Sequence, residues 1–186
     1  MISELELLDW KRRIFDLYAE VRASDPRAGW ERWRAVRAEL FRDHPQSPSP
    51  GYAALAYYDY DPALRLLADV EPVEEQPIAI DGFPFRRFAV ARFELGSLEL
   101  YWLEGYGGGV FLPFADETRG TETYGAGRYL LDTVKGSYLG LEGGRLVLDF
   151  NFAYNPSCSY DDRWACPLTP PPNRLSIPVR GGERLE

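Results

Sequence analysis

The sequence predicts an α+β fold in which an N-terminal helical hairpin packs on a mainly antiparallel β-barrel or strongly curved sheet. Three observations predict it. Apolar residues recur at three- and four-residue steps as far as Phe41, which is the period of an amphipathic helix. From residue 52 onward the pattern changes to short runs that are rich in β-forming residues and separated by turn signals. Aromatic residues make up 15% of the chain, with 12 tyrosines, which favours β structure and a ring-lined interior.

The first 48 residues are expected to form two helices. Ser3 and Glu6 have the spacing of a capping box, and one face of the helix that follows carries Leu7, Trp10, Ile14, Leu17, Tyr18 and Val21. The sequence Ser24-Asp25-Pro26 ends this helix and begins another, because Ser or Asp accepts hydrogen bonds from free amides and proline suits a first turn. The same period then continues through Trp30, Trp33, Arg37, Leu40 and Phe41, until Pro45 ends the second helix.

The remainder of the chain is expected to form short strands. The runs that predict them are "YAALAYYDY", "LLADVEPV", "RRFAVARFEL", "LELYWLE", "GVFLPF", "TETYGAGRYLL", "GSYLGL", "RLVLDFNF" and "LSIPV". Gly96-Ser97 and Glu142-Gly143-Gly144 are hairpin turn signals, and residues 74–77 are expected to be a loop. Short connections imply antiparallel neighbours, because a parallel crossover needs a dozen or more residues. A meander of about seven to nine such strands would curl or close on itself.

The length favours one domain. A chain of 186 residues is long enough for one full hydrophobic core and short for two, and it contains no repeat or linker that would divide it. We therefore expect a single domain over 1–186, with the helical hairpin at 1–48. A β-rich body at 52–180 would then be closed by the loop at 153–174.

The charge balance argues against two classes of partner. The chain has 21 basic and 29 acidic residues, a net charge of −8, so its surface is expected to repel phosphate backbones and anionic headgroups. The sequence therefore predicts no nucleic-acid partner and no membrane partner. The opening stretch "MISELELLDWKRRIF" has acids before its first bases and no uninterrupted apolar run, which is typical neither of a secretory signal nor of a membrane span. A cytoplasmic protein is expected.

Several motifs together resemble a known family. They are "WKRRIFDLYAEVR", "HPQSP", "YDYDPALR", "FLPFADETRGTETYGAGRYL", "LDFNFAYNPSCSYDDRWACPLTPPPNRL" and a closing "GGE". These motifs cover nearly the whole chain, which is similar to the prokaryotic domain-of-unknown-function family numbered 1684. Two positions depart from the pattern, because Thr169 stands where a proline is expected and Gly181 where an alanine is expected. The resemblance implies a single-domain bacterial or archaeal protein, and it supplies no reaction, ligand or catalytic residue.

The two cysteines, Cys158 and Cys166, are expected to be reduced thiols that are largely buried in a packed loop. A disulfide between them is the second interpretation. A zinc site made by both thiols, His44 and a carboxylate is disfavoured, because structural zinc sites use four ligands at shorter cysteine spacings. The sequence therefore predicts no metal and no cofactor.

Three residues are weak candidates for catalysis. Cys158 is a nucleophile only if it meets a base, and His44 is the one histidine of the chain. His44 lies just past a helix end, where it could simply cap carbonyls or pack under prolines. Alternation along 145–152 places Asp149 on a polar face together with Asn151, so Asp149 could act as a base or a ligand acceptor. The alternative is that this face is merely solvated.

Arg128 is flanked by aromatic residues in a predicted inner strand, where a guanidinium needs a planar anionic partner. Asp116 or Asp149 would make a structural ion pair with it, and this is favoured over a clamp for a ligand carboxylate because buried charges are ordinarily paired. We expect Arg128 and Asp149 to face a shared hollow.

The stretch from Asp149 to Arg174 holds both cysteines and five prolines, so it is expected to have one conformation. Its asparagines can satisfy the backbone of an ordered loop. Tyrosine hydroxyls and amides beside a barrel mouth also suit a small-molecule pocket. The residues expected to bind a ligand are Arg128, Asp149, Asn151, Tyr154, Asn155, Tyr160 and Asn173.

Two functions follow from these features. The first is a small-molecule binding protein, with or without catalysis, whose pocket lies at one mouth of the barrel. The second is a protein-interaction or structural module that uses the aromatic face of the N-terminal helices, in which Trp30 and Trp33 would be exposed. The chain is expected to be a monomer or a homodimer.

Overall fold

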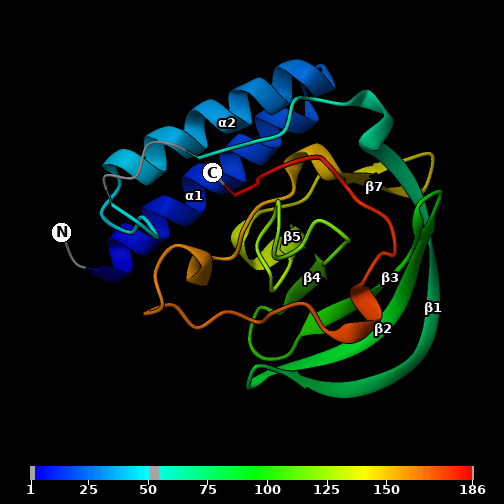
Figure 1. Cartoon of the computed structure of the whole chain (residues 1–186). Helices are drawn as coiled ribbons and strands as arrows, with labels where there is room; N and C mark the ends of the chain where they lie inside the picture. The colour runs from blue at the N-terminus through cyan, green and yellow to red at the C-terminus, as the bar shows by residue number, and fades with distance from the viewer. Residues whose placement is uncertain (1–2, 51–54, 186) are drawn as a thin grey trace.

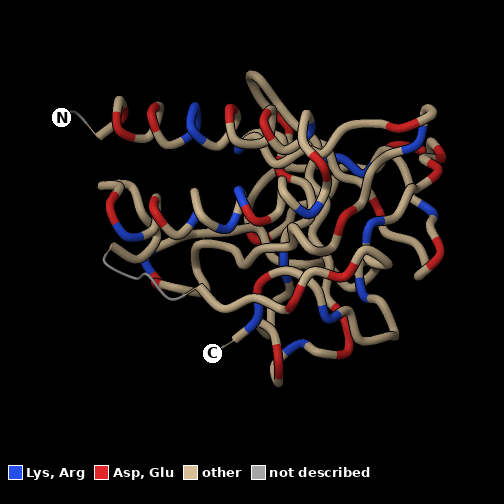
Figure 2. The backbone as a smooth tube through the Cα atoms, turned by 90° about the horizontal axis from the view of Figure 1, so that it is seen from above, with Lys and Arg blue, Asp and Glu red and all other residues tan. Residues whose placement is uncertain are grey.

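The N-terminal hairpin has the predicted form. A computed structural model describes residues 3–50 and 55–185, and in it helices α1 (Ser3–Arg22) and α2 (Pro26–Asp43) lie side by side across one side of the sheet (Figures 1 and 2). Asp25 caps α2, because its Oδ1 accepts hydrogen bonds from the amides of Arg27 at 3.1 Å and Ala28 at 3.2 Å.

No helix in the described part of the chain combines the length and the apolar character that a membrane span requires.

The remaining chain is built around one antiparallel sheet that curls strongly and stays open (Figure 1). Its strand order is β5-β4-β3-β2-β1-β7-β6, so β5 and β6 form the two edges and the strands do not close into a barrel. The strands are β1 (Arg65–Ile80), β2 (Phe83–Phe93), β3 (Gly96–Leu103), β4 (Gly109–Phe114), β5 (Arg128–Asp132), β6 (Leu141–Glu142) and β7 (Arg145–Asp149).

Two-residue turns join three of the six neighbouring pairs of strands, which are β1–β2, β2–β3 and β6–β7. Gly143 and Gly144 connect β6 to β7 with φ angles of 56° and 81°, the left-handed region that a two-residue hairpin turn demands, as the sequence predicted. The turn between β2 and β3 is made by residues 94–95, because Phe93 already pairs with Gly96. This hairpin therefore turns two residues before the predicted Gly96-Ser97.

The segment at 74–77 is not the predicted loop. It lies inside β1, where the pairing with β2 moves from Pro72 opposite Ala89 to Gln76 opposite Arg87. A bulge of this kind bends a strand and raises its twist, which suits a long strand within a strongly curled sheet.

Several other predicted strands differ from the structure. The run 136–141 is a strand only at Leu141, where β6 begins, and the run 145–152 is a strand only as far as Asp149. The run 121–131 is a strand only from Arg128, because Gly127 adopts a φ of 95° and belongs to a turn. The run 175–179 is an irregular segment. The run 52–60 lies partly outside the described residues, and residues 55–60 contribute only an isolated bridge between Tyr57 and Glu183.

The aromatic face of the hairpin is buried in the chain's own core. Trp30 and Trp33 have exposed fractions of 4% and 1%, and they pack with Phe152 and the apolar residues of α1. The indole of Trp30 donates a hydrogen bond of 3.0 Å to the carbonyl of Asn151. The prediction that these tryptophans present an interaction surface is therefore wrong, because the hairpin uses them to attach to the sheet.

The C-terminal segment, residues 174–185, runs from the sheet to the helices and is drawn in red in Figure 1. Backbone hydrogen bonds hold it on several sides, including Tyr58 N to Gly182 O at 3.0 Å and Glu183 N to Ala153 O at 2.8 Å. Gly182 has a φ of 76°, and a Cβ at this position would lie 2.3 Å from the carbonyl oxygen of Ala153. Only glycine fits there.

Gly182→Ala is therefore expected to lower the free energy of unfolding by more than about 3 kcal/mol, because positive-φ strain and a backbone clash act together. Gly143→Ala is the matched control, since its φ is 56° and nothing lies within 4 Å of the added Cβ. It should cost about 1 kcal/mol, from strain alone. Urea denaturation of both variants measures the difference, and equal losses would contradict the close packing of the C-terminal segment.

Candidate functional site

Arg128 has the structural partner that the sequence favoured. Its side chain is 1% exposed, and Nη2 donates to Asp116 Oδ2 at 2.8 Å and to the carbonyl of Val179 at 2.9 Å. Nη1 donates to the carbonyls of Gly181 and Glu183. Burial lowers the pKa of the guanidinium, and the charge of Asp116 opposes that effect. Because both terminal nitrogens already donate twice, Arg128 has no terminal N–H left for a ligand.

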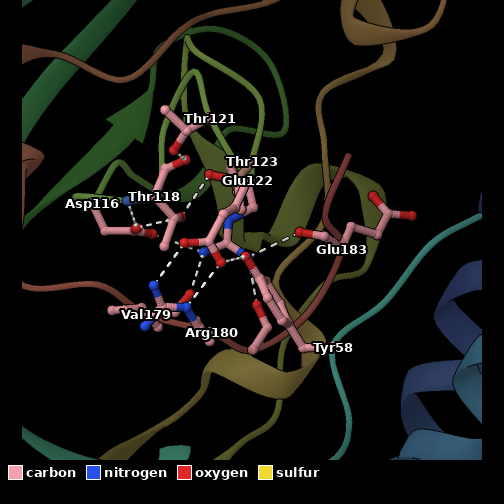
Figure 3. A network of polar contacts seen from close by, with 11 residues as sticks. Tyr58, Asp116, Thr118, Thr121, Glu122, Thr123, Val179, Arg180 and Glu183 are labelled. Carbon is pink, nitrogen blue, oxygen red and sulfur yellow. Dashed lines mark hydrogen bonds and ion pairs between the residues drawn. The ribbon is translucent and has the colours of Figure 1, made fainter. Parts of the chain in front are cut away.

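Around this ion pair lies a polar network that also anchors the C-terminal segment (Figure 3). Asp116 Oδ1 accepts hydrogen bonds from the amide and the hydroxyl of Thr118 at 2.7 and 2.5 Å. Glu122 binds Arg180 through two hydrogen bonds of 2.8 and 2.7 Å, and it also accepts one from the hydroxyl of Tyr58. These contacts join the loop after β4 to the end of the chain, so their role is structural.

Asn151 and Asn173 satisfy backbone groups, as the sequence allowed. Asn173 accepts from Glu99 N at 2.8 Å and donates to the carbonyls of Glu99 and Pro113, which ties its loop to β3 and β4. Asn151 makes the equivalent pair of bonds with the backbone of Asp61 at 2.9 and 2.8 Å. The amide groups of both side chains are engaged within the protein.

Tyr160 and Asn155 meet at Glu183 instead of surrounding Asp149. Glu183 is 1% exposed and accepts hydrogen bonds from Tyr160 Oη at 2.9 Å, from the amide of Asn155 at 2.6 Å and from Arg37 Nη2 at 2.5 Å. Sequence reasoning placed Arg37 on an apolar helix face and missed this ion pair. An arginine in that position was the available signal, because a buried guanidinium requires a partner.

Tyr154 and Asn155 line a small cavity of about 50 Å³ between the helices and the loop after β7. The Oδ1 atom of Asn155 is buried there without a hydrogen-bond partner. A space of this size with polar groups on its wall suits a few ordered water molecules.

The thiol and imidazole candidates lie in different surroundings. Cys158 and Cys166 are free thiols, as expected, and burial raises the pKa of Cys158 to about 11. His44 Nε2 lies 3.2 Å from Asp9 Oδ2, and its Nδ1 accepts a hydrogen bond of 3.0 Å from the amide of Gln46. His44 is thus engaged within the helical hairpin and does not contact Cys158. Within residues 3–50 and 55–185, no three His, Cys, Asp or Glu side chains are grouped to hold a metal ion.

Two of the predicted residues, Asn155 and Asp149, have a buried side-chain oxygen without a partner, and in Asp149 that oxygen belongs to a carboxylate. Asp149 ends β7 and is 1% exposed, and its Oδ1 accepts from the amide and the side-chain Nδ2 of Asn151 at 3.0 and 2.8 Å. Oδ2 is buried and accepts no hydrogen bond. Burial raises the pKa of this carboxyl to about 6, although the bonds from Asn151 and the charge of Arg65 act in the opposite direction.

Asp149 faces a cleft of about 340 Å³ between the α1–α2 turn, the start of β1 and the β6–β7 hairpin. We call it the Asp149 cleft. Its polar lining is formed by Arg22, Ser24, Arg65, Glu142 and Asp149, and its apolar lining includes Val21, Pro26, Leu139, Leu141, Val147 and Phe152.

Arg65 lies next to Asp149 in the sheet, but its guanidinium forms an ion pair with Glu142. Arg65 and Asp149 are directly opposite in the β1–β7 register, yet the guanidinium of Arg65 makes bonds of 2.5 and 3.2 Å to the two oxygens of Glu142. The free oxygen of Asp149 therefore persists beside a cation that binds another carboxylate. Buried acceptors are normally satisfied, so the unpartnered Oδ2 of Asp149 requires an explanation.

The expectation that Arg128 and Asp149 share one hollow is wrong. Arg128 is enclosed by Asp116 and the C-terminal segment and does not line the Asp149 cleft. Its strand, β5, is an edge of the sheet, and β4, β3, β2 and β1 lie between it and β7 in the strand order. The chain after β7 returns to β5, where Tyr154 pairs with Tyr129, yet the side chain of Arg128 binds the C-terminal segment and Asp149 lines the cleft.

Asp149→Asn should remove a pH dependence of stability. Below about pH 4 the carboxyl is protonated in both states, and as the pH rises to about 6 the unfolded chain ionises first. The free energy of unfolding should therefore fall by about 3 kcal/mol over this window and then level off. Asp149→Asn should be more stable than the native protein at pH 7.5, with the advantage shrinking towards pH 4. Denaturation curves at several pH values test this, and parallel profiles for both proteins would contradict it.

The thiols should react slowly in the folded protein. A pKa of about 11 for Cys158 reduces its thiolate fraction roughly a hundredfold relative to an ordinary thiol. Labelling with a disulfide reagent at pH 8 should accelerate sharply when urea unfolds the chain. His44→Gln should leave the native rate unchanged, and a large decrease in that variant would instead indicate a reactive Cys–His pair.

Comparisons with known proteins place the chain in a family. Residues 50–184 match the family described as "Protein of unknown function (DUF1684)". The chain is also similar to the solution NMR structure of an uncharacterized protein from Haloarcula marismortui, with 32% sequence identity and a TM-score of 0.56. That match covers 83% of this chain and 93% of the other. No curated protein matches the sequence. The chain therefore belongs to the DUF1684 family of proteins of unknown function.

Proposed function

We propose that this protein binds a small polar molecule in the Asp149 cleft and that Asp149 Oδ2 is the atom that recognises it. The observation that carries the proposal is the buried, unpartnered carboxylate oxygen of a residue that lines a cleft. An acceptor that is buried without a hydrogen bond costs about 1–3 kcal/mol, and more if it is charged. A ligand that donates an N–H or O–H to Oδ2 would remove this cost.

The shape and lining of the cleft support a small-molecule site. Its volume of about 340 Å³ falls within the range of roughly 300–1,000 Å³ that is typical of ligand pockets. One wall is apolar, and the polar groups on the other side are few, which is the composition that fixes both the position and the orientation of a ligand.

We also propose that the protein is cytoplasmic, and the two free thiols support this location because thiols stay reduced in that compartment.

The carboxyl of Asp149 also has the property that proton transfer requires. A pKa of about 6 leaves both protonation states populated near neutral pH, which is the condition for efficient general acid or base work. A nucleophile that Asp149 could activate is not available among the described residues that line the cleft. No Cys side chain lines the cleft, and the hydroxyl of Ser24 already donates to the carbonyl of Glu20 at 2.7 Å. Binding is therefore the function that the geometry supports best.

A ligand screen tests the proposal. Small polar molecules are screened by ligand-observed NMR against the native protein, Asp149→Asn and the control Asp162→Asn, whose aspartate is exposed in the loop after β7. Asp149→Asn presents an amide to the ligand, so hits should bind it at least roughly tenfold more weakly, while Asp162→Asn binds them normally. Hits that bind all three proteins equally would place the site elsewhere.

A further inference from the structure

We infer that the ligand of the Asp149 cleft is a free α-amino acid with an apolar side chain, an inference that rests on the function proposed above. Three features of the cleft lead to it: the free oxygen of Asp149, the guanidinium of Arg65 beside it, and an apolar wall. Each matches one of the three groups that such a molecule carries.

The free oxygen of Asp149 matches an ammonium group. A cation with three N–H donors satisfies the vacant acceptor and also compensates the buried negative charge, which a neutral donor does not. Glu142 is the other carboxylate of the cleft, and its oxygens are already bound to Arg65. Asp149 is thus the carboxylate of the cleft that has an oxygen to offer.

The guanidinium of Arg65 matches a carboxylate. Its planar fork binds carboxylates through two parallel hydrogen bonds, and it already binds Glu142 in this way. Glu142 is half exposed and belongs to a two-residue edge strand, so its pairing with Arg65 contributes little in water. A ligand carboxylate can therefore take its place on Arg65, and Glu142 then turns to solvent.

The two charged partners in the cleft favour a zwitterion. Once Glu142 has turned to solvent, a ligand with only an ammonium would leave Arg65 without an anionic partner. A ligand with only a carboxylate would leave Asp149 Oδ2 without a donor. A ligand with both groups on one carbon atom gives each residue a partner, because Arg65 and Asp149 are directly opposite each other on adjacent strands.

The apolar part of the lining matches the side chain. Val21, Leu139, Val147 and Phe152 contribute to it, from α1, the segment before β6, β7 and the turn after β7. Burying an aliphatic side chain against such a surface adds favourable binding energy in proportion to the area removed from water. The volume of about 340 Å³ accommodates an amino acid of this class.

Three matched probes separate the contributions of the charged groups. L-leucine carries both the ammonium and the carboxylate. L-leucinamide lacks the carboxylate, and 4-methylpentanoate lacks the ammonium while keeping the side chain. Isothermal titration calorimetry at pH 7.5 should show that L-leucine, or another aliphatic or aromatic amino acid tested beside it, binds at least roughly tenfold more tightly than its two analogues.

Substitutions in the cleft test whether Arg65 binds the carboxylate of the ligand. Arg65→Met should lower the affinity for the amino acid to about that of its amide, and Glu142→Gln should raise it several-fold, because Arg65 is then free before the ligand arrives. Arg92→Met is the matched control, since Arg92 pairs with Glu71 at 2.6 Å on an exposed face and does not line the cleft. It should bind as the native protein does. Thermal unfolding verifies that each variant is folded.

The outcomes distinguish this inference from the function on which it rests. If no apolar amino acid binds more tightly than its amide and its deaminated analogue, or if Glu142→Gln weakens binding, the inference is overturned. If other molecules from the screen still depend on Asp149, the proposed binding function stands without it. If no molecule depends on Asp149, both are wrong.

Discussion

The fold depends on one buried guanidinium, that of Arg128, which donates hydrogen bonds to the carbonyls of the C-terminal segment. Arg128 sits at the start of β5, an edge strand, and its four terminal N–H groups bind Asp116 and three carbonyls of the C-terminal segment. An irregular segment cannot satisfy its own carbonyls, and when it is buried those groups need donors from elsewhere. Arg128 supplies them at one point and so fixes the path of residues 179–183 across the protein.

That path determines where a second buried ion pair forms. Glu183 is carried to the helices, where it binds Arg37 of α2 and receives the hydroxyl of Tyr160 and the amide of Asn155. The pair connects the last part of the chain to its first 43 residues through the interior. Breaking a buried pair by removing one partner leaves an uncompensated charge, which typically costs about 3–5 kcal/mol. The two arginines therefore join sheet, C-terminal segment and helices into one arrangement.

Against this background the free oxygen of Asp149 stands out. Asp116 and Glu183 are as deeply buried as Asp149, and both are bound by a guanidinium. Asp149 has an arginine as its neighbour on the adjacent strand, yet that arginine binds Glu142. Structural carboxylates in this protein are thus paired, and the carboxylate in the cleft wall is not. This contrast within one chain is the physical basis for placing a ligand site at Asp149.

The sequence by itself determined the parts of this protein whose causes are local. The helical period, the cap at Asp25, the Gly143-Gly144 turn and the antiparallel class of the sheet all follow from residues close together in the chain. Asp149 was predicted as a candidate for the same reason, because alternation along 145–152 placed it on the polar face of a strand together with Asn151. Only the tertiary structure decided which acid pairs with Arg128, that the sheet stays open, and that Arg65 binds Glu142. These outcomes join residues as far apart as 65 and 142, and they depend on strand order and on the path of the C-terminal segment, which no short-range pattern encodes.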